Sequence, residues 1–302
     1  MVVRDNRVTV EVRRSDGQTF RVGSGTGWKI PNDGLKDWNV MEHEVSTAAN
    51  VLTDGSSLVS KRLGEKDRTL RAVYCDVDAD NERARAIAFF NPKFAFEAYV
   101  SYRGRTRWCG GEQIGFKVTT ENVYAKPEIT WTLLCLDPYL KDPDGNESAF
   151  GDSVPMFGFP FVSHYREPLP DGTKQPAGFM ASKLIYDGKN TVWNSGDVDT
   201  LYTVRVEAKG TLKNPTITKD GRHVRMLLTL YEGDVLLIDF NAAPPSVTKN
   251  GQNVIHYASR DSAFTKMQMQ VGKNVFSFTV DNEENRSLAK VQVLFHKKYL
   301  GV

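Results

Sequence analysis

Apolar and polar residues alternate with a period of two through most of this 302-residue chain, which predicts β-strands. In the segment 129–135, every second residue is large and apolar or a cysteine: Ile129, Trp131, Leu133 and Cys135. Pro138 lacks a backbone N–H and disfavours the helical region for Asp137, so the strand should end there. Loop residues follow, and the pattern predicts two domains, residues 1–140 and 141–302.

One helix is expected in the first half of the chain. Asp78 or Asp80 would cap it, and Asn91-Pro92 would end it. Its apolar face would consist of Ala84, Ile87 and Ala88. The preceding acidic run begins like an EF-hand calcium loop, but Asn81 stands where that loop needs Gly, and Ile87 where it needs Glu. A calcium site is therefore not expected.

A polar arm separates the strand predicted at residues 42–46 from the strand predicted at residues 68–75. It contains the turn Asp54-Gly55 and the charged stretch from Leu58 to Asp67. This arm carries more charge than a tight hairpin needs. We therefore expect a protruding hairpin or loop that packs on something other than its own domain.

Two connections are predicted from their turn residues. Gly110-Gly111 should break the strand that begins at Thr106, so that a new strand starts at Ile114. Further on, the apolar runs 227–230 and 235–239 should form a hairpin around a turn at residues 232–234.

The second half has short strands and regular turns but no helical periodicity, which is typical of an antiparallel β-sandwich. The aromatic run Met156–Phe161 is expected to be an edge strand that closes the core, with a ligand groove as the alternative. Residues 166–178 are expected to form a surface loop. Trp193, the only tryptophan of this half, would be a core or rim residue, or else a platform for a sugar.

Charge and cysteine content exclude several classes of function. Lys plus Arg is 39 and Asp plus Glu is 37, so the net charge of +2 gives no electrostatic footprint for nucleic acid or an anionic membrane. The three cysteines, Cys75, Cys109 and Cys135, contain no Cys-x-x-Cys pair and are expected to be reduced thiols, as in a cytoplasmic protein. Neither a secretory signal nor an apolar run of the roughly 20 residues that span a membrane is expected.

No pattern of catalytic, cofactor-binding or metal-ligating residues emerges. The five histidines lack metal-ligand spacing, and there is no Gly-x-Ser-x-Gly nucleophile motif. The glycine-rich stretch 23–27 matches neither phosphate-binding fingerprint. Glu232, Asp234 and Asp239 are expected to serve a turn and a strand face rather than a glycosidase site. We therefore predict no enzyme activity and no cofactor.

A set of short motifs, in this order along nearly the whole chain, resembles the distal tail protein (Dit) family of long-tailed bacteriophages. The fragments are Gly27–Ile30, Asp54-Gly55, Arg68–Cys75, the helix ending at Asn91-Pro92, Leu136–Tyr139, Asn194–Asp197, Gly210–Pro215, Gly233–Asp239, Lys249–Gly251 and Val271–Asn274. Each fragment alone is a common turn or strand. Their order carries the resemblance.

The resemblance implies a mainly β protein with an N-terminal strand-rich α+β domain that builds a homohexameric ring, and a C-terminal galectin-like β-sandwich. It implies a structural virion protein at the tail tip or baseplate, made in the bacterial cytoplasm. Expected partners are the tail tube protein, tail-associated proteins and a receptor-binding protein.

The alternative reading is a carbohydrate-binding module or adhesin that uses the C-terminal sandwich to bind host-surface glycans. A shared fold does not decide between the two functions.

Overall fold

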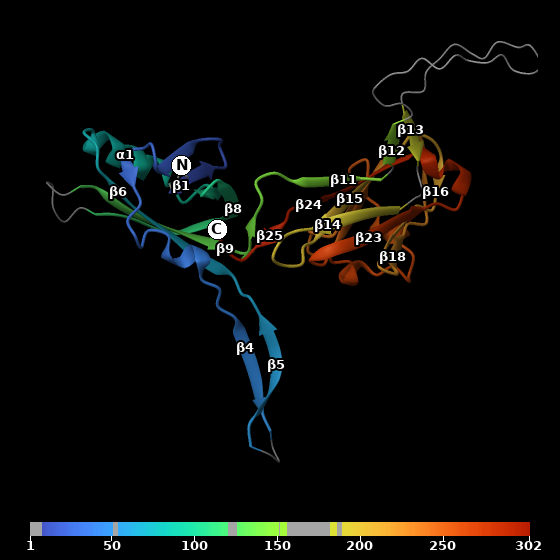
Figure 1. Ribbon diagram of the computed structural model, residues 1–302, viewed down its shortest axis with the longest axis horizontal. Helices are drawn as coiled ribbons and strands as arrows, with labels where there is room; N and C mark the ends of the chain where they lie inside the picture. The colour runs from blue at the N-terminus through green and yellow to red at the C-terminus, as the bar shows by residue number, and fades with distance from the viewer. Residues whose placement is uncertain (1–7, 51–53, 120–125, 151, 156–181, 186–188) are drawn as a thin grey trace, which may run out of the picture. The chain divides into compact units, whose positions relative to one another are not determined.

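The computed structural model describes residues 8–50, 54–119, 126–150, 152–155, 182–185 and 189–302 (Figure 1). Two compact units are present. The first comprises Met1–Gly145, Gly196–Val198 and His296–Val302, and the second Asn146–Ser195 and Asp199–Phe295. The end of the chain therefore returns to the first unit, which the sequence pattern does not predict.

The first unit is built on a nine-stranded antiparallel sheet with the order β2-β1-β7-β8-β9-β6-β3, to which β10 and β25 are added beside β8. Strand β9 buries every second side chain, as its alternation predicts. The strands are β1 (Val8–Arg14), β2 (Thr19–Gly23), β3 (Trp28–Lys29), β6 (Lys66–Tyr74), β7 (Phe96–Tyr102), β8 (Arg105–Val118), β9 (Glu128–Cys135), β10 (Leu140–Lys141) and β25 (Lys298–Tyr299). A 3₁₀ helix, η1 (Lys36–Asn39), and a separate hairpin of β4 (Glu44–Ala49) and β5 (Ser56–Arg62) complete the unit.

The helix of the first unit, α1 (Ala79–Phe89), begins and ends near the predicted residues, but its predicted buried face is wrong. Ala84, Ile87 and Ala88 are exposed, whereas Ala86 and Phe89 are buried. The aromatic rings at the end of the helix decide the orientation, because Phe89 packs 5.3 Å from the Phe20 ring in the core. The Asp78 side chain makes no capping bond and instead accepts a 2.9 Å hydrogen bond from Asn81.

The predicted break at Gly110-Gly111 is also wrong, because β8 runs through both residues as one strand of 14 residues. A Cβ atom on Gly111 would lie 2.1 Å from the backbone oxygen of Leu134 in β9. Glycine therefore permits a close approach of two strands here. The irregularity in the pairing with β9 lies further along, between Gln113 and Gly115.

The second unit consists of two main antiparallel sheets, β11-β24-β15-β20-β21-β22 and β14-β23-β17-β18. Side chains of both sheets share one hydrophobic core, in which Tyr202 of β15 meets Phe276 of β23 with ring centroids 5.1 Å apart. The arrangement is a sandwich, as predicted. Its strands are β11 (Asn146–Ala149), β14 (Lys189–Asn194), β15 (Tyr202–Ala208), β17 (Thr216–Lys219), β18 (Arg222–Arg225), β20 (Val235–Asp239), β21 (Ser246–Lys249), β22 (Gln252–Asn253), β23 (Gly272–Thr279) and β24 (Ala289–Phe295).

Two short pairs accompany these sheets: β12 (Asp152–Pro155) with β13 (Ser182–Ile185), and β16 (Leu212–Lys213) with β19 (Thr229–Leu230). The predicted turn at residues 232–234 is present, with Gly233 at φ 87°. The predicted hairpin across it is wrong, because β19 pairs with β16 while β20 pairs with β15 and β21. The turn instead carries the chain from one sheet to another, and Leu230 and Leu236 reach the same core from different sheets.

The remaining helices are short 3₁₀ turns, η2 (Ile255–Tyr257), η3 (Phe264–Lys266) and η4 (Glu283–Leu288). In the part of the chain that the structure describes, no helix is long and apolar enough to cross a membrane. The predictions for Met156–Phe161 and for residues 166–178 lie outside the described residues.

A carboxylate ties the returning end of the chain to the first unit. Asp137 Oδ2 lies 3.0 Å from Lys141 Nζ and 2.9 Å from Lys298 Nζ. Burial alone would raise the pKa of Asp137, but the two ammonium groups outweigh it and hold the pKa below its usual value of 3.8. The charged form is therefore the one that the fold stabilises.

We expect Asp137→Asn to lower the free energy of unfolding at pH 7 by about 1 kcal/mol, a small effect because the side chain is 31% exposed. Because the pKa of Asp137 is lower in the folded than in the unfolded chain, its charged form stabilises the fold at pH values above 3.8, the usual value. This stabilisation is lost as the pH falls through the lower pKa of the folded state. The difference between the two proteins should therefore shrink below about pH 4 in urea unfolding curves. A difference that stays constant down to pH 2 would contradict the ion-pair explanation.

Candidate interaction surfaces

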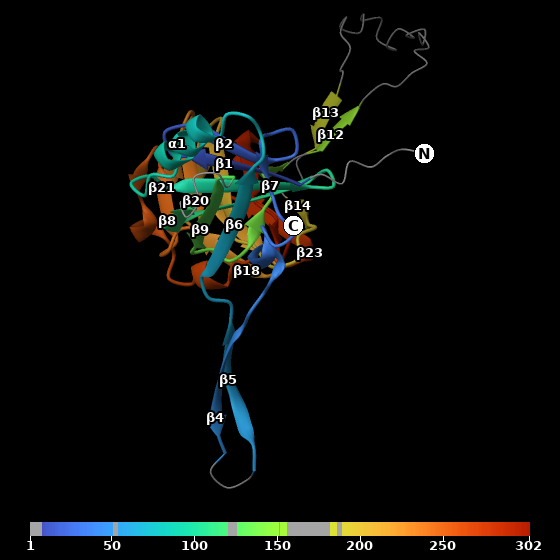
Figure 2. The same cartoon turned by 90° about the vertical axis from the view of Figure 1, so that its left-hand side faces the viewer.

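The β4–β5 hairpin extends away from the rest of the first unit in both views (Figures 1 and 2). Its two strands pair only with each other among the described residues, and every residue of both strands is exposed. A two-stranded hairpin without a packed face is marginally stable in water. The predicted protruding arm is therefore present, and its strands expose backbone and side chains suited to a further contact.

Apolar side chains mark one face of this hairpin. Val45 is 56% exposed and Leu58 is 64% exposed. Leu58 is paired with Thr47, two residues after Val45, so the register places Val45 and Leu58 on the same face. Val59 is the extra residue at the irregularity in the pairing. Burying the two aligned side chains in a contact would contribute roughly 3–6 kcal/mol.

The first unit also has an apolar hollow, separate from the hairpin strands, with a volume of about 470 Å³. Side chains from distant parts of the sequence line it. They include Val8, Ile30, Leu35, Trp38, Val100, Tyr102 and Val302. The first unit thus has a projecting hairpin with two aligned apolar side chains and, separately, a concave apolar surface.

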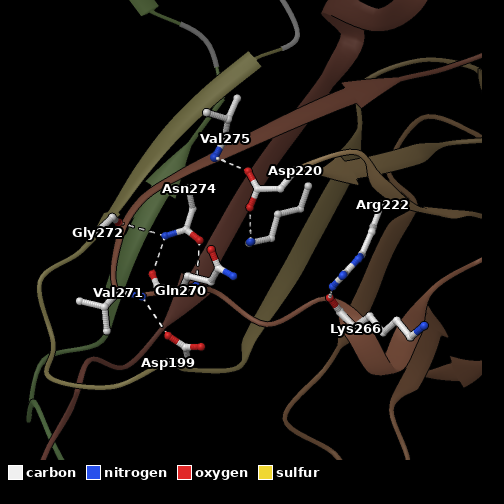
Figure 3. Close-up of polar contacts among 10 residues, drawn as sticks. Asp199, Asp220, Arg222, Lys266, Gln270, Val271, Gly272, Asn274 and Val275 are labelled. Carbon is white, nitrogen blue, oxygen red and sulfur yellow. Dashed lines mark hydrogen bonds and ion pairs between the residues drawn. The ribbon is translucent and has the colours of Figure 1, made fainter.

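In the second unit, a polar hollow of about 430 Å³ is lined by Asp199, Lys219, Asp220, Arg222, Thr265, Lys266, Gln268 and Gln270. These residues come from the segment before β15, the β17–β18 hairpin, and η3 with the segment leading to β23 (Figure 3). This site is not visible in the sequence. No motif joins its residues, because only the fold brings residues 199, 220 and 270 together.

Hydrogen bonds hold the backbone around the polar hollow in place (Figure 3). Asn274 is fully buried, and its side-chain Nδ2 donates to the oxygens of Gln270 and Gly272 at 2.7 Å and 3.0 Å. Its Oδ1 accepts from the Gln270 N–H at 2.9 Å. Asp199 Oδ1 accepts from the Val271 N–H at 3.0 Å. Side-chain hydrogen bonds to the backbone therefore hold this loop in place.

Trp193 lies on the outer face of the β14-β23-β17-β18 sheet, where it is 63% exposed and opposite Lys273. A core position is thus excluded, and a rim or platform position remains for this side chain. Trp193 does not line the polar hollow.

Other residues weighed as chemical candidates have structural contacts. Asp234 Oδ2 pairs with Lys249 Nζ at 2.8 Å and accepts from the Tyr231 N–H, which suits a turn. The three cysteines are free thiols; Cys109 and Cys135 are buried. Contact with Cys135, together with burial, holds the pKa of the Cys109 thiol well above its usual value, as for an unreactive core thiol. Within the described residues, no group of His, Cys, Asp and Glu side chains could hold a metal ion.

Residues 195–299 match the family of the siphovirus-type tail component, C-terminal domain. The whole chain also resembles the crystal structure of the SPP1 Dit (gp 19.1) protein, described as a paradigm of the hub adsorption apparatus in Gram-positive infecting phages. The TM-score is 0.62 at 12% identity, over 96% of this chain and 98% of that chain. The phage P2 baseplate in its activated conformation with Ca matches with a TM-score of 0.48 at 9% identity, over 98% of this chain and 99% of that chain. No curated protein matches the sequence.

Proposed function

We propose that the chain is a structural protein of the phage tail tip, of the siphovirus-type tail component family that residues 195–299 match, and that six copies of it form a ring. The ring joins the tail tube to the tail tip or baseplate. It serves as the hub to which receptor-binding and tail-associated proteins attach.

The observation that carries the proposal is the fully exposed β4–β5 hairpin with its aligned Val45 and Leu58. A closed ring arises when two different surfaces of one subunit meet repeatedly and the rotation closes. The hairpin and the apolar hollow around Trp38 are two such surfaces on the same unit. They differ in shape, one projecting and one concave, as a head-to-tail contact requires.

The two units have separate roles in this proposal. Residues 1–140 form the ring, because the hairpin and most of the hollow lie in this part of the chain. Val302, from the returning end of the chain, also lines the hollow. The second unit, residues 146–195 and 199–295, forms the sandwich, which supplies attachment surface around the ring. Exposed aromatic side chains such as Trp193 are enriched in protein contacts of this kind.

Negative-stain electron microscopy of the purified full-length chain tests this function. We expect closed rings with one diameter and sixfold symmetry in class averages. Single particles of the size of one chain at every concentration, or open filaments, would contradict the proposal.

A further inference from the structure

We propose that the polar hollow of the second unit, formed by Asp199, Asp220, Arg222, Lys266 and Gln270, is a binding site for a saccharide unit. This inference goes beyond the ring function and does not depend on it.

The lining selects a ligand that is polar over most of its surface. All eight lining side chains are charged, amide or hydroxyl groups, and neither an aromatic nor an aliphatic residue is among them. Ligand sites more often combine an apolar lining with a few polar groups. A sugar hydroxyl both donates and accepts, so it needs carboxylate oxygens and cationic or amide N–H groups side by side. A volume of about 430 Å³ suits one or two sugar rings.

The acceptors of the site are fixed before a ligand arrives. Asp220 forms an ion pair with Lys219, whose side chain is only 5% exposed. The N–H of Val275 donates to the other oxygen of Asp220 at 3.5 Å (Figure 3). Asp199 is held by its bond from the Val271 N–H. Rigid acceptors lower the entropic cost of binding, which matters most for a weakly binding sugar.

Arg222 and Gln270 supply donors to the lining. Arg222 Nη1 donates to the backbone oxygen of Lys266 at 2.8 Å, which orients the guanidinium and leaves its other N–H groups for a ligand. The side-chain amide of Gln270 is exposed, while the backbone of the same residue is held by Asn274. Donors and acceptors that line the hollow therefore come from separate segments of the chain.

The charges of the lining favour an uncharged ligand over an anion. Lys219, Arg222 and Lys266 are opposed by Asp199 and Asp220, so three positive charges meet two negative charges. A phosphate entering the hollow would meet both carboxylates and lose most of its attraction to the cations. A sugar hydroxyl can donate to the carboxylates and accept from the cationic groups.

Saturation-transfer NMR on the full-length protein tests the site with methyl glycosides of glucose, galactose and N-acetylglucosamine as probes, and with inorganic phosphate as the anion. We expect saturable binding of at least one glycoside with a Kd of about 1 mM. Arg222→Ala and Gln270→Ala should each weaken it, Arg222→Ala by about tenfold or more, because a hydrogen bond to a charged group is lost.

Two variants act as controls. Trp193→Ala removes an exposed aromatic side chain of the same domain, and Arg205→Ala removes a half-exposed arginine of the other sheet. Neither change should alter the affinity. Absence of saturable binding for every glycoside would overturn the proposal. So would loss of binding in Trp193→Ala with retention in Arg222→Ala, or binding of phosphate alone. Ring formation, seen by microscopy, is a separate readout and should be unchanged in all four variants.

Discussion

Val45→Asp/Leu58→Asp should leave the purified protein monomeric under conditions where the unmodified chain forms rings. Both side chains are exposed on one face of the β4–β5 hairpin, so the change does not disturb a core. Each subunit contact would lose roughly 3–6 kcal/mol of apolar burial and would also have to bury two carboxylates. Light scattering coupled to size-exclusion chromatography measures the mass directly.

The control places one such charge on an exposed leucine of the second unit. Leu227→Asp changes an exposed leucine there and should leave the rings intact. The double hairpin variant should still unfold in a cooperative thermal transition, which shows that the unassembled chain is folded. If the double variant assembles as well as the Leu227→Asp control, the hairpin is not a ring contact.

Trp131→Ala should have the largest effect on stability. Its side chain is fully buried, its ring centroid lies 5.3 Å from Phe90 and 5.7 Å from Phe96, and its Nε1 donates to Gln113 Oε1 at 3.1 Å. Truncation leaves a cavity and removes the donor to Gln113 Oε1, with an expected cost of about 3–5 kcal/mol. For a unit of this size, the melting temperature should fall by about 10 °C.

Trp193→Ala is the corresponding control, because that indole is on the surface of the second unit. Its unfolding free energy should change by less than about 0.5 kcal/mol. Since the two units have separate cores, Trp131→Ala should shift the transition of the first unit alone in differential scanning calorimetry. A single transition that shifts as a whole would contradict independent cores.

The strands could be predicted because a half-buried strand exposes every second residue, a pattern that is local in sequence. Strand β9 and the alternating valines of β1 show it clearly. The buried face of α1 could not be predicted in the same way. Its small apolar residues suggested one face, but the larger rings of Phe89 and Phe90 found room in the core and turned the helix toward them.

Pairing between strands was harder to predict than the strands themselves. A turn such as the one at Gly233 is visible in the sequence, but whether its flanking strands pair with each other depends on partners far along the chain. The same limit explains the error at Gly110-Gly111, because Gly111 permits a close approach to Leu134 rather than breaking the strand.

Of the interaction surfaces, too, only the one that depends on a local sequence property could be predicted. The projecting arm was predicted, because its excess of charge over 10 or so residues is a local property. The polar hollow was not, since Asp199, Asp220 and Gln270 are separated by tens of residues and become neighbours only in the folded sandwich. Trp193 was recognised as a candidate, but only the register of β14 with β23 places it on the outer face.

Native mass spectrometry of the full-length chain tests the central claim most directly, because it counts the copies in the assembly. The ring proposal predicts a dominant species at about six times the 33.9 kDa chain mass. A spectrum with only the single-chain mass, at concentrations well above those used for microscopy, would contradict it.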